Sequence, residues 1–320
     1  MRKTGQEAMS NTAGETETRV ADAPAGNWVD RYMPAGFRPY LRLSRADRPI
    51  GTWLLLWPCL WGIALATSAQ RGGFPSLKLM FLFAVGAAVM RGAGCTYNDI
   101  IDREIDAKVA RTARRQLPSG QVTVERAIAW MMLQALIGLA VLVTFNATTI
   151  RLALGSLALI AAYPFMKRIT YWPQVWLGLT FNWGALVGWT AVTDSLSGPA
   201  FWLYAGGILW TIGYDTIYAH QDKEDDALIG VKSTAIRFAD RTKFWLRVFY
   251  GGAWIAFLAA LIGASGGFFA YVGLLLVGIH MLWQIRWLDI DDPQNCLMIF
   301  SSNRNLGFIL FAGLLLGLWL

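Results

Sequence analysis

Nine long apolar segments, separated by short polar stretches, make up most of the chain after residue 34. An α-helix needs about 20 apolar residues to cross a bilayer, and most of these segments are close to that length. Glycine and proline mark several boundaries, as in Gly72-Gly73, Gly198-Pro199 and Gly266-Gly267. The fourth, eighth and ninth segments are short for a full crossing. The predicted fold is an all-α bundle of nine transmembrane helices, with approximate limits Ile50–Ala69, Leu77–Tyr97, Val124–Phe145, Leu152–Met166, Val175–Val192, Phe201–Ala219, Phe244–Ile262, Phe268–Trp283 and Leu306–Leu320.

The composition supports a membrane protein. Hydrophobic residues make up 55% of the chain, charged residues make up 15%, and there are 16 tryptophans. A soluble domain carries about 25% charged residues, and tryptophan is enriched at membrane–water interfaces. The net charge of +7 is spread over short loops between the apolar segments, without forming one patch. We therefore expect contact with membrane lipid and no nucleic-acid partner.

The first 34 residues differ from the rest of the chain. They are polar, rich in Ala, Gly, Glu and Thr, and contain no apolar run. This excludes a secretory signal peptide, and the segment is too acidic for a typical mitochondrial presequence. We expect residues 1–34 to form a disordered leader and residues 35–320 to form the membrane domain.

The basic residues are distributed unevenly between the loops. With nine spans, one side of the membrane holds the leader and the loops after the even-numbered segments, and it carries nearly all of the loop Lys and Arg. The other side carries only Arg71, Lys78 and Arg151. Basic loops stay in the cytoplasm, which predicts a cytoplasmic N-terminus and a C-terminus on the far side. We expect a multi-pass protein of a bacterial inner membrane.

Two acidic segments each follow a long apolar segment, where a membrane helix would meet water. In the first, Asn98, Asp102 and Asp106 are spaced i, i+4, i+8. In the second, Asp222 and Asp226 are spaced i, i+4, and Asp215 precedes Asp222 by seven residues. On a helix these spacings put the side chains on one face.

The pairing of the two segments indicates a metal site. Carboxylates that share a face repel one another unless a cation lies between them. Hard oxygen ligands suit Mg²⁺, which often bridges to phosphate oxygens. A single acidic run is usually a solvated loop, but these two are similar in spacing, and the predicted topology puts both on the cytoplasmic side. The sequence therefore predicts a membrane-embedded enzyme that handles a diphosphate.

Basic and aromatic residues surround these segments. Lys108, Arg111 and Arg115 continue the helical spacing after Asp106, and Tyr163-Pro-Phe-Met-Lys167-Arg168 ends the fourth segment. The cytoplasmic excess of basic residues alone accounts for any one of these. A bound diphosphate also needs cations beside the metal.

Two arginines are candidates for a different role. Arg91 lies inside the second span, where a charge is costly and marks a functional site by default. The alternative is a structural ion pair with an acidic residue such as Asp215. Arg48 precedes Pro49 at the start of the first span, where it could hold a carboxylate.

These residues resemble the motifs of the UbiA superfamily of intramembrane aromatic prenyltransferases. The shared patterns are Asn98-x-x-x-Asp102-x-x-x-Asp106, Tyr163-x-x-x-Lys167 and Asp222-x-x-x-Asp226, and the resemblance extends from about Leu41 to Leu320. Asp47-Arg-Pro-Ile-Gly-Thr52 and Met90-Arg-Gly-Ala-Gly-Cys95 resemble the branch that prenylates 4-hydroxybenzoate for ubiquinone. One departure is Gln116, where the family usually has proline.

The resemblance implies helices around a central cavity and Mg²⁺-dependent transfer of a polyprenyl group from polyprenyl diphosphate to the ring of 4-hydroxybenzoate. It implies that Lys167 helps to draw off the leaving diphosphate, and it leaves Asp99 and Asp215 as candidates for taking the ring proton. The implied metal ligands are Asn98, Asp102, Asp106, Asp222 and Asp226. The candidate substrate-binding residues are Arg48, Arg91, Asn98, Arg111, Arg115, Tyr163, Arg168 and Tyr218.

Two alternatives remain open. The acceptor could be homogentisate, a naphthoate, a chlorophyll precursor or haem, all used within the same superfamily. The chain could also be an ion-coupled transporter, although transporters place their carboxylates near the bilayer midplane in broken helices, and these lie at segment ends.

Overall fold

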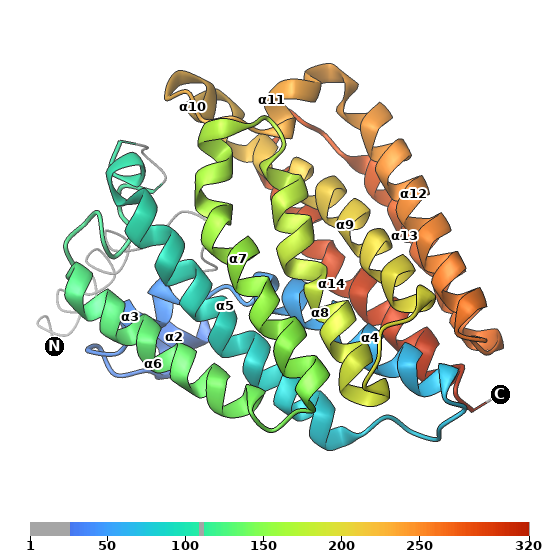
Figure 1. The fold of residues 1–320 in the computed structure, drawn as a ribbon. Helices are drawn as coiled ribbons and strands as arrows, with labels where there is room; N and C mark the ends of the chain where they lie inside the picture. The colour runs from blue at the N-terminus through green and yellow to red at the C-terminus, as the bar shows by residue number, and fades with distance from the viewer. Residues whose placement is uncertain (1–25, 109–111, 320) are drawn as a thin grey trace, which may run out of the picture. The chain divides into compact units, whose positions relative to one another are not determined.

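The computed structural model describes residues 26–108 and 112–319, and within these ranges it consists of helices and connecting turns without strands (Figure 1). The all-α prediction is confirmed. The helices are α2 Trp28–Tyr32, α3 Arg38–Leu43, α4 Ile50–Ala69, α5 Leu77–Asp106, α6 Val124–Leu142, α7 Ala147–Ile169, α8 Pro173–Thr193, α9 Gly198–Ala219, η1 His220–Asp222, α10 Lys223–Leu228, α11 Thr234–Phe238, η2 Ala239–Arg241, α12 Thr242–Gly263, α13 Phe268–Trp287 and α14 Pro293–Leu316.

Every predicted span corresponds to a long helix. Eight helical segments in the described ranges are long and apolar enough to cross a membrane, which is close to the predicted nine. Helix α9 has 22 residues but is less apolar by hydropathy, because Gly, Tyr and Trp take up much of its length. The three segments that looked short are longer as helices: α7 has 23 residues, α13 has 20 and α14 has 24.

The chain divides into two compact units. Unit 1 comprises residues 1–49 and 89–136, and unit 2 comprises residues 50–88 and 137–320. Helices α5 and α6 each contribute to both units. Unit 1 carries the first acidic segment, and unit 2 carries the second.

Unit 1 is built on the short helices α2 and α3. The Trp28 indole donates a hydrogen bond to the carbonyl oxygen of Ala46 at 2.7 Å, and Arg42 forms an ion pair with Asp30 at 2.7 Å. Residues 26–34 of the predicted leader therefore contact the segment that follows them. Trp130 of α6 donates to the hydroxyl of Ser44 at 2.8 Å, which ties α6 to the end of α3.

Unit 2 contains the main hydrophobic core. Trp61 of α4 packs against Trp210 of α9, with ring centroids 5.2 Å apart, and against Phe257 of α12 at 5.6 Å. The Trp61 indole donates to the carbonyl oxygen of Gly307 on α14 at 3.0 Å. One fully buried side chain thus joins four helices, and its only polar atom is satisfied.

Helices α4 and α8 approach each other closely through small residues. A Cβ atom on Gly188 would overlap the backbone carbonyl of Cys59, and one on Gly62 would overlap the carbonyl of Ala185. In lipid, helices associate mainly by close packing, which small residues permit. Glycine is required here because backbone atoms of the facing helix occupy the space of a side chain.

We expect Gly188→Ala to lower the stability of the protein by about 1–3 kcal/mol, the usual cost of overpacking a tight contact. Gly251→Ala is the matched control, because nothing lies within 4 Å of a Cβ at Gly251 on α12. The measurement is the midpoint of thermal unfolding in detergent. Equal midpoints for the two variants would show that α4 and α8 are not closely packed at Gly188.

Candidate functional site

The first acidic segment lies on helix α5. This helix continues nine residues past the predicted span and ends at Asp106, so Asn98, Asp102 and Asp106 share one helical face, as their spacing predicts. Asp102 has no exposed side-chain surface and Asp106 is 5% exposed. Carboxylates this well buried need compensating charge or hydrogen bonds.

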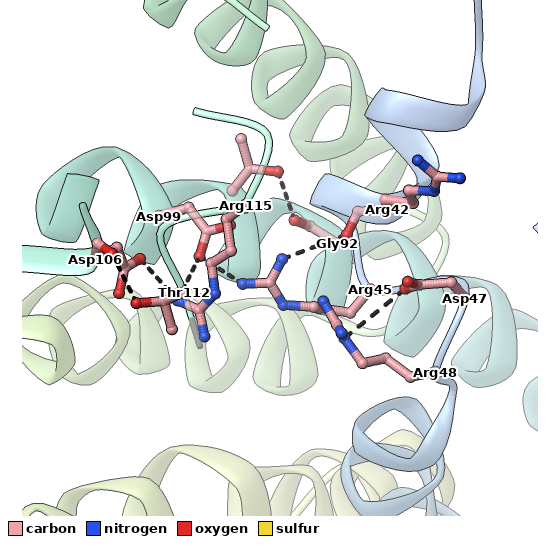
Figure 2. Close-up of polar contacts among 10 residues, drawn as sticks. Arg42, Arg45, Asp47, Arg48, Gly92, Asp99, Asp106, Thr112 and Arg115 are labelled. Atoms are coloured by element: carbon pink, nitrogen blue, oxygen red, sulfur yellow. Dashed lines mark hydrogen bonds and ion pairs between the residues drawn. The ribbon is translucent and has the colours of Figure 1, made fainter. Parts of the chain in front are cut away.

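Two arginines supply part of this compensation (Figure 2). Arg45 Nη2 lies 2.6 Å from Asp99 Oδ1. Arg115 Nη1 lies 2.7 Å from Asp106 Oδ2 and 3.5 Å from Asp99 Oδ1. The guanidinium group of Arg115 thus bridges two carboxylates on α5, and Asp99 faces two arginines.

A turn between α3 and α4 presents further charged side chains. Arg45 has a left-handed backbone, with φ of 58°, a conformation that costs energy for a non-glycine residue. Asp47 and Arg48 follow, both buried, with Arg48 Nε 3.8 Å from Asp47 Oδ1. Figure 2 shows Arg45 and Arg48 extending from this turn, with Arg45 directed toward α5. The left-handed conformation of this turn places the Arg45 side chain next to Asp99.

The segment after Asp106 corrects one prediction. Lys108 and Arg115 do not continue the helix, because α5 ends at Asp106 and the two residues lie in a turn and a bend, respectively. Lys108 is exposed, and Arg111 lies outside the described residues. The hydroxyl of Thr112 donates to the carbonyl oxygen of Asp106 at 2.8 Å. The chain therefore folds back on the helix end, which brings Arg115 to the carboxylates from a loop.

Gln116 is a candidate that the motif analysis did not include. Its side chain is fully buried, and neither its amide nitrogen nor its amide oxygen has a hydrogen-bond partner among the described residues. Burying an amide without a partner costs free energy. The sequence signal was the glutamine in place of the family's usual proline. Gln116 is therefore placed to accept or donate a hydrogen bond beside Arg115.

The spacing of the second acidic segment, in unit 2, suggested one continuous helix. The structure shows a helix that is interrupted. Helix α9 ends at Ala219, the 3₁₀ turn η1 covers His220–Asp222, and α10 begins at Lys223. Asp215 lies on α9, Asp222 is the N-cap residue of α10, and Asp226 lies in the first turn of α10. All three are half-buried. The carboxylates of Asp222 and Asp226 thus lie around the start of α10, where the helix dipole favours negative charge.

Contacts to neighbouring helices fix this segment. Lys223 forms an ion pair with Asp291 in the loop after α13, and this ammonium group lowers the pKa of Asp291. His220 Nε2 lies 2.9 Å from the hydroxyl of Thr242 at the start of α12. Burial, and secondarily the charge of Lys223, lower the pKa of His220 to about 4, so the ring is neutral at physiological pH. The bend between α9 and α10 is thus held from two sides.

The candidates on α7 lie at the same end of unit 2. Tyr163 and Lys167 are one turn apart on the helix and both are half-buried, whereas Arg168 is exposed, with its guanidinium carbon 5.9 Å from the Phe165 ring centroid. The Lys232 amide donates to the carbonyl oxygen of Lys167 at 2.9 Å. This bond ties the end of α7 to the loop that follows α10.

Two other candidates differ in their surroundings. The Tyr218 ring, on the last turn of α9, lies 4.5 Å from the Phe300 ring of α14. Arg91 lies within α5, which contains the predicted second span, and its side chain is half-buried.

No group of three His, Cys, Asp or Glu side chains in the described ranges lies close enough to hold a metal ion by itself. Within each unit, two carboxylates lie on neighbouring turns: Asp102 and Asp106 in unit 1, and Asp222 and Asp226 in unit 2. Carboxylate oxygens are the donors that Mg²⁺ prefers.

We expect Asp99→Asn to destabilise the protein by about 3–5 kcal/mol, because it leaves Arg45 without its carboxylate and removes one of the two carboxylates that Arg115 contacts. The control is Glu104→Gln on the same helix, where the side chain is 83% exposed and its pair with Arg103 is 3.7 Å long; exposed pairs contribute little. Thermal unfolding in detergent compares the two. If Asp99→Asn unfolds like the control, Asp99 is not the structural anchor of this cluster.

Comparisons with known proteins give a consistent assignment. The UbiA prenyltransferase family matches residues 55–314. The chain is 50% identical to a mitochondrial 4-hydroxybenzoate polyprenyltransferase from Arabidopsis thaliana, over 91% of this chain and 71% of that protein. It is also 50% identical to the human protein of the same name, over 89% of this chain and 77% of that protein.

Solved structures agree on the fold. A UbiA homologue from Aeropyrum pernix superposes with a TM-score of 0.70 at 24% identity, covering 82% of this chain and 97% of that one. A UbiA homologue from Archaeoglobus fulgidus, bound to GPP and Mg²⁺, superposes with a TM-score of 0.58 at 17% identity, covering 86% and 99%. The chain is a multi-pass membrane protein that belongs to the UbiA prenyltransferase family.

Proposed function

We propose that this protein transfers a polyprenyl group from polyprenyl diphosphate to 4-hydroxybenzoate in ubiquinone biosynthesis. The observation that carries the proposal is the pair of carboxylates at the end of α5 matched by a second pair around the start of α10. The choice of acceptor is supported by 50% sequence identity to relatives that are named for this activity. Carboxylates at helix ends also favour an enzyme over a transporter with charges at the membrane midplane.

We propose that Asp102, Asp106, Asp222 and Asp226 hold Mg²⁺ together with the diphosphate, with Asn98 as a further ligand or orienting group. Bound Mg²⁺ would neutralise charge that develops on the departing diphosphate. In the structure described here, Arg115 contacts Asp106. When Mg²⁺ and the substrate bind, Arg115 would have to share Asp106 with the metal ion or release it. The guanidinium group of Arg115 would then lie next to the diphosphate.

The basic and hydroxyl side chains have separate roles in this proposal. Lys167 donates to the leaving diphosphate, with Arg111, Arg115 and Arg168 as further cations and Tyr163 and Tyr218 as hydroxyl donors. The carbon–oxygen bond of the prenyl diphosphate breaks, and the ring carbon ortho to the acceptor hydroxyl forms the new carbon–carbon bond. Apolar and aromatic walls exclude water from the allylic cation and stabilise it.

The ring proton must then leave the acceptor. Asp99 and Asp215 were the candidates for taking it. Asp99 faces Arg45 and Arg115, and accepting a proton would weaken both ion pairs. We therefore favour Asp215 as the proton acceptor and assign Asp99 to positioning Arg45 and Arg115.

A direct assay tests the proposed function. Purified protein with Mg²⁺, polyprenyl diphosphate and 4-hydroxybenzoate should form the prenylated acid, and excess chelator should stop the reaction until Mg²⁺ is restored. Asp102→Ala and Asp222→Ala should each reduce turnover by about two orders of magnitude or more, the scale of losing an electrostatic stabiliser.

Glu104→Ala and Glu224→Ala are the matched controls, because these carboxylates are exposed and lie two residues from Asp102 and Asp222. They should keep full turnover. Normal activity in both aspartate variants would show that the acidic segments are solvated loops. Homogentisate, a naphthoate, haem and a chlorophyll precursor, offered in place of 4-hydroxybenzoate, test the alternative acceptors.

Arg48 and Arg91 are the candidates for binding the acceptor carboxylate, since a planar guanidinium matches its two oxygens. Replacement by lysine keeps the charge and removes the bidentate geometry. We expect Arg48→Lys or Arg91→Lys to raise the KM for 4-hydroxybenzoate about tenfold, equivalent to one hydrogen bond to a charged group, with the KM for the prenyl donor unchanged. If both variants leave the acceptor KM unaltered, another residue selects the acceptor.

We propose a bacterial inner membrane as the location, with the N-terminus and both acidic segments on the cytoplasmic side. The relatives are named as mitochondrial, and in a mitochondrion the matrix would take the place of the cytoplasm. The uneven distribution of basic residues supports the orientation.

Cysteine labelling tests this topology. Ser119 and Leu228 are exposed and follow the first and second acidic segments respectively. Because Cys59, Cys95 and Cys296 are buried, a membrane-impermeant thiol reagent should report introduced cysteines selectively. Both Ser119→Cys and Leu228→Cys should react from the cytoplasmic side. Reaction from opposite sides would rule out a shared substrate for the two segments.

A further inference from the structure

Three cations that the catalytic proposal does not use converge on one cavity of unit 2. The cavity has a volume of about 390 Å³ and is lined by Lys243, Arg247, Leu282, Ile285 and Arg286. Lys243 and Arg247 lie on the first two turns of α12, and Arg286 lies on the last turn of α13. These helices pack side by side (Figure 1).

No acidic side chain among the described residues neutralises the three cations. In the part of the chain that the structure describes, none of them forms an ion pair, and no acidic residue lines the cavity. Like charges in one cavity disfavour one another, and the positive end of the α12 dipole adds to them. The arrangement is therefore suited to a bound anion.

The surface next to the cavity is apolar. Leu275, Ile279 and Leu282 are exposed and spaced i, i+4, i+7 along α13, on the face that leads to Arg286. The indoles of Trp283 and Trp287 are also exposed near the end of this helix, in the position of an interfacial aromatic belt.

Helix α12 also has an exposed apolar face, on a different side of the helix from its cavity residues. Val248, Ile255 and Ile262 are exposed at seven-residue spacing, about a quarter-turn around the helix from Lys243 and Arg247. The apolar face of α13, which ends at the cluster of cations, matches an amphiphile with an anionic headgroup.

We propose that this cavity binds the phosphate headgroup of an anionic phospholipid, whose acyl chains lie along the exposed apolar face of α13. Basic pockets between membrane helices on the cytoplasmic or matrix side are suited to such headgroups. A free phosphate would fill only the polar end and would leave the apolar face without a role. The lipid joins the start of α12 to the end of α13.

The location gives this lipid a structural connection to the second acidic segment. Thr242, next to Lys243, contacts His220 of η1, and the loop after α13 holds Lys223 through Asp291. A lipid that joins α12 to α13 thus braces the two elements that hold η1 and the start of α10.

The test compares lipid binding by full-length variants in detergent. The site variant combines Lys243→Gln, Arg247→Gln and Arg286→Gln. The control variant combines Arg151→Gln, Arg241→Gln and Arg304→Gln, which removes the same charge from exposed residues that do not line the cavity. Native mass spectrometry measures the affinity for phosphatidylglycerol and phosphatidylcholine, and the thermal midpoint is recorded with and without each lipid.

We expect phosphatidylglycerol to bind the unmodified and control proteins more tightly than phosphatidylcholine and to raise their thermal midpoints. The site variant should lose about two orders of magnitude in affinity for phosphatidylglycerol, since each basic residue near the surface contributes about fivefold. A variant with Lys243→Arg, Arg247→Lys and Arg286→Lys keeps the charge and should retain binding, which separates loss of the site from a folding defect.

Three results would overturn the proposal. The first is equal affinity for the two lipids. The second is equal loss of phosphatidylglycerol binding in the site and control variants. The third is an equal rise in thermal midpoint with inorganic phosphate alone, which would indicate a site for a free anion.

Discussion

The cost of burying carboxylates next to a membrane determines the arrangement of unit 1. Asp99 and Asp102 have no exposed side-chain surface, and Asp106 has little. Such groups remain in the folded protein only with compensating positive charge. Arg45 supplies it from a strained turn, and Arg115 supplies it from a loop that returns to the end of α5. The chain on both sides of α5 is therefore organised around the acidic face of that helix.

The same constraint accounts for what sequence reasoning could and could not predict. Hydrophobic length predicted the long helices well, because backbone groups in lipid must be satisfied within a helix. The i, i+4, i+8 spacing placed Asn98, Asp102 and Asp106 correctly on one face. The spacing failed for Lys108 and Arg115, since α5 ends at Asp106 and tertiary ion pairs, which have no periodic signature, fix the loop beyond it.

The second acidic segment shows a similar limit. Its seven-residue spacing suggested one helix, but the chain bends at His220. Contacts from Lys223 to Asp291 and from His220 to Thr242 fix that bend, and both partners are distant in sequence. Gln116 was visible as a departure from a family pattern, but only the structure shows that its amide is buried without a partner. Local patterns identified the residue types, while the polar contacts that position them depend on the fold.

The two acidic segments are held in place by different contacts. Salt bridges internal to unit 1 hold the first acidic segment, whereas contacts to α12 and to the loop after α13 hold the second. The cationic cavity lies between those same two helices, so a bound phospholipid would act on the support of the second segment and leave the first unchanged. Under both proposals, the lipid would stabilise the support of only one of the two acidic segments.

The proposed function requires that both acidic segments serve one metal–diphosphate complex. Mn²⁺ can replace Mg²⁺ as a paramagnetic probe, with labels attached at Glu104→Cys and Glu224→Cys and with polyprenyl diphosphate present. The account predicts that Mn²⁺ broadens the magnetic-resonance signals of both labels, and that the two effects saturate at the same Mn²⁺ concentration. It also predicts that either Asp102→Ala or Asp222→Ala abolishes the effect at both labels. Broadening at one label only, or broadening at one label that survives substitution in the other segment, would contradict a shared site.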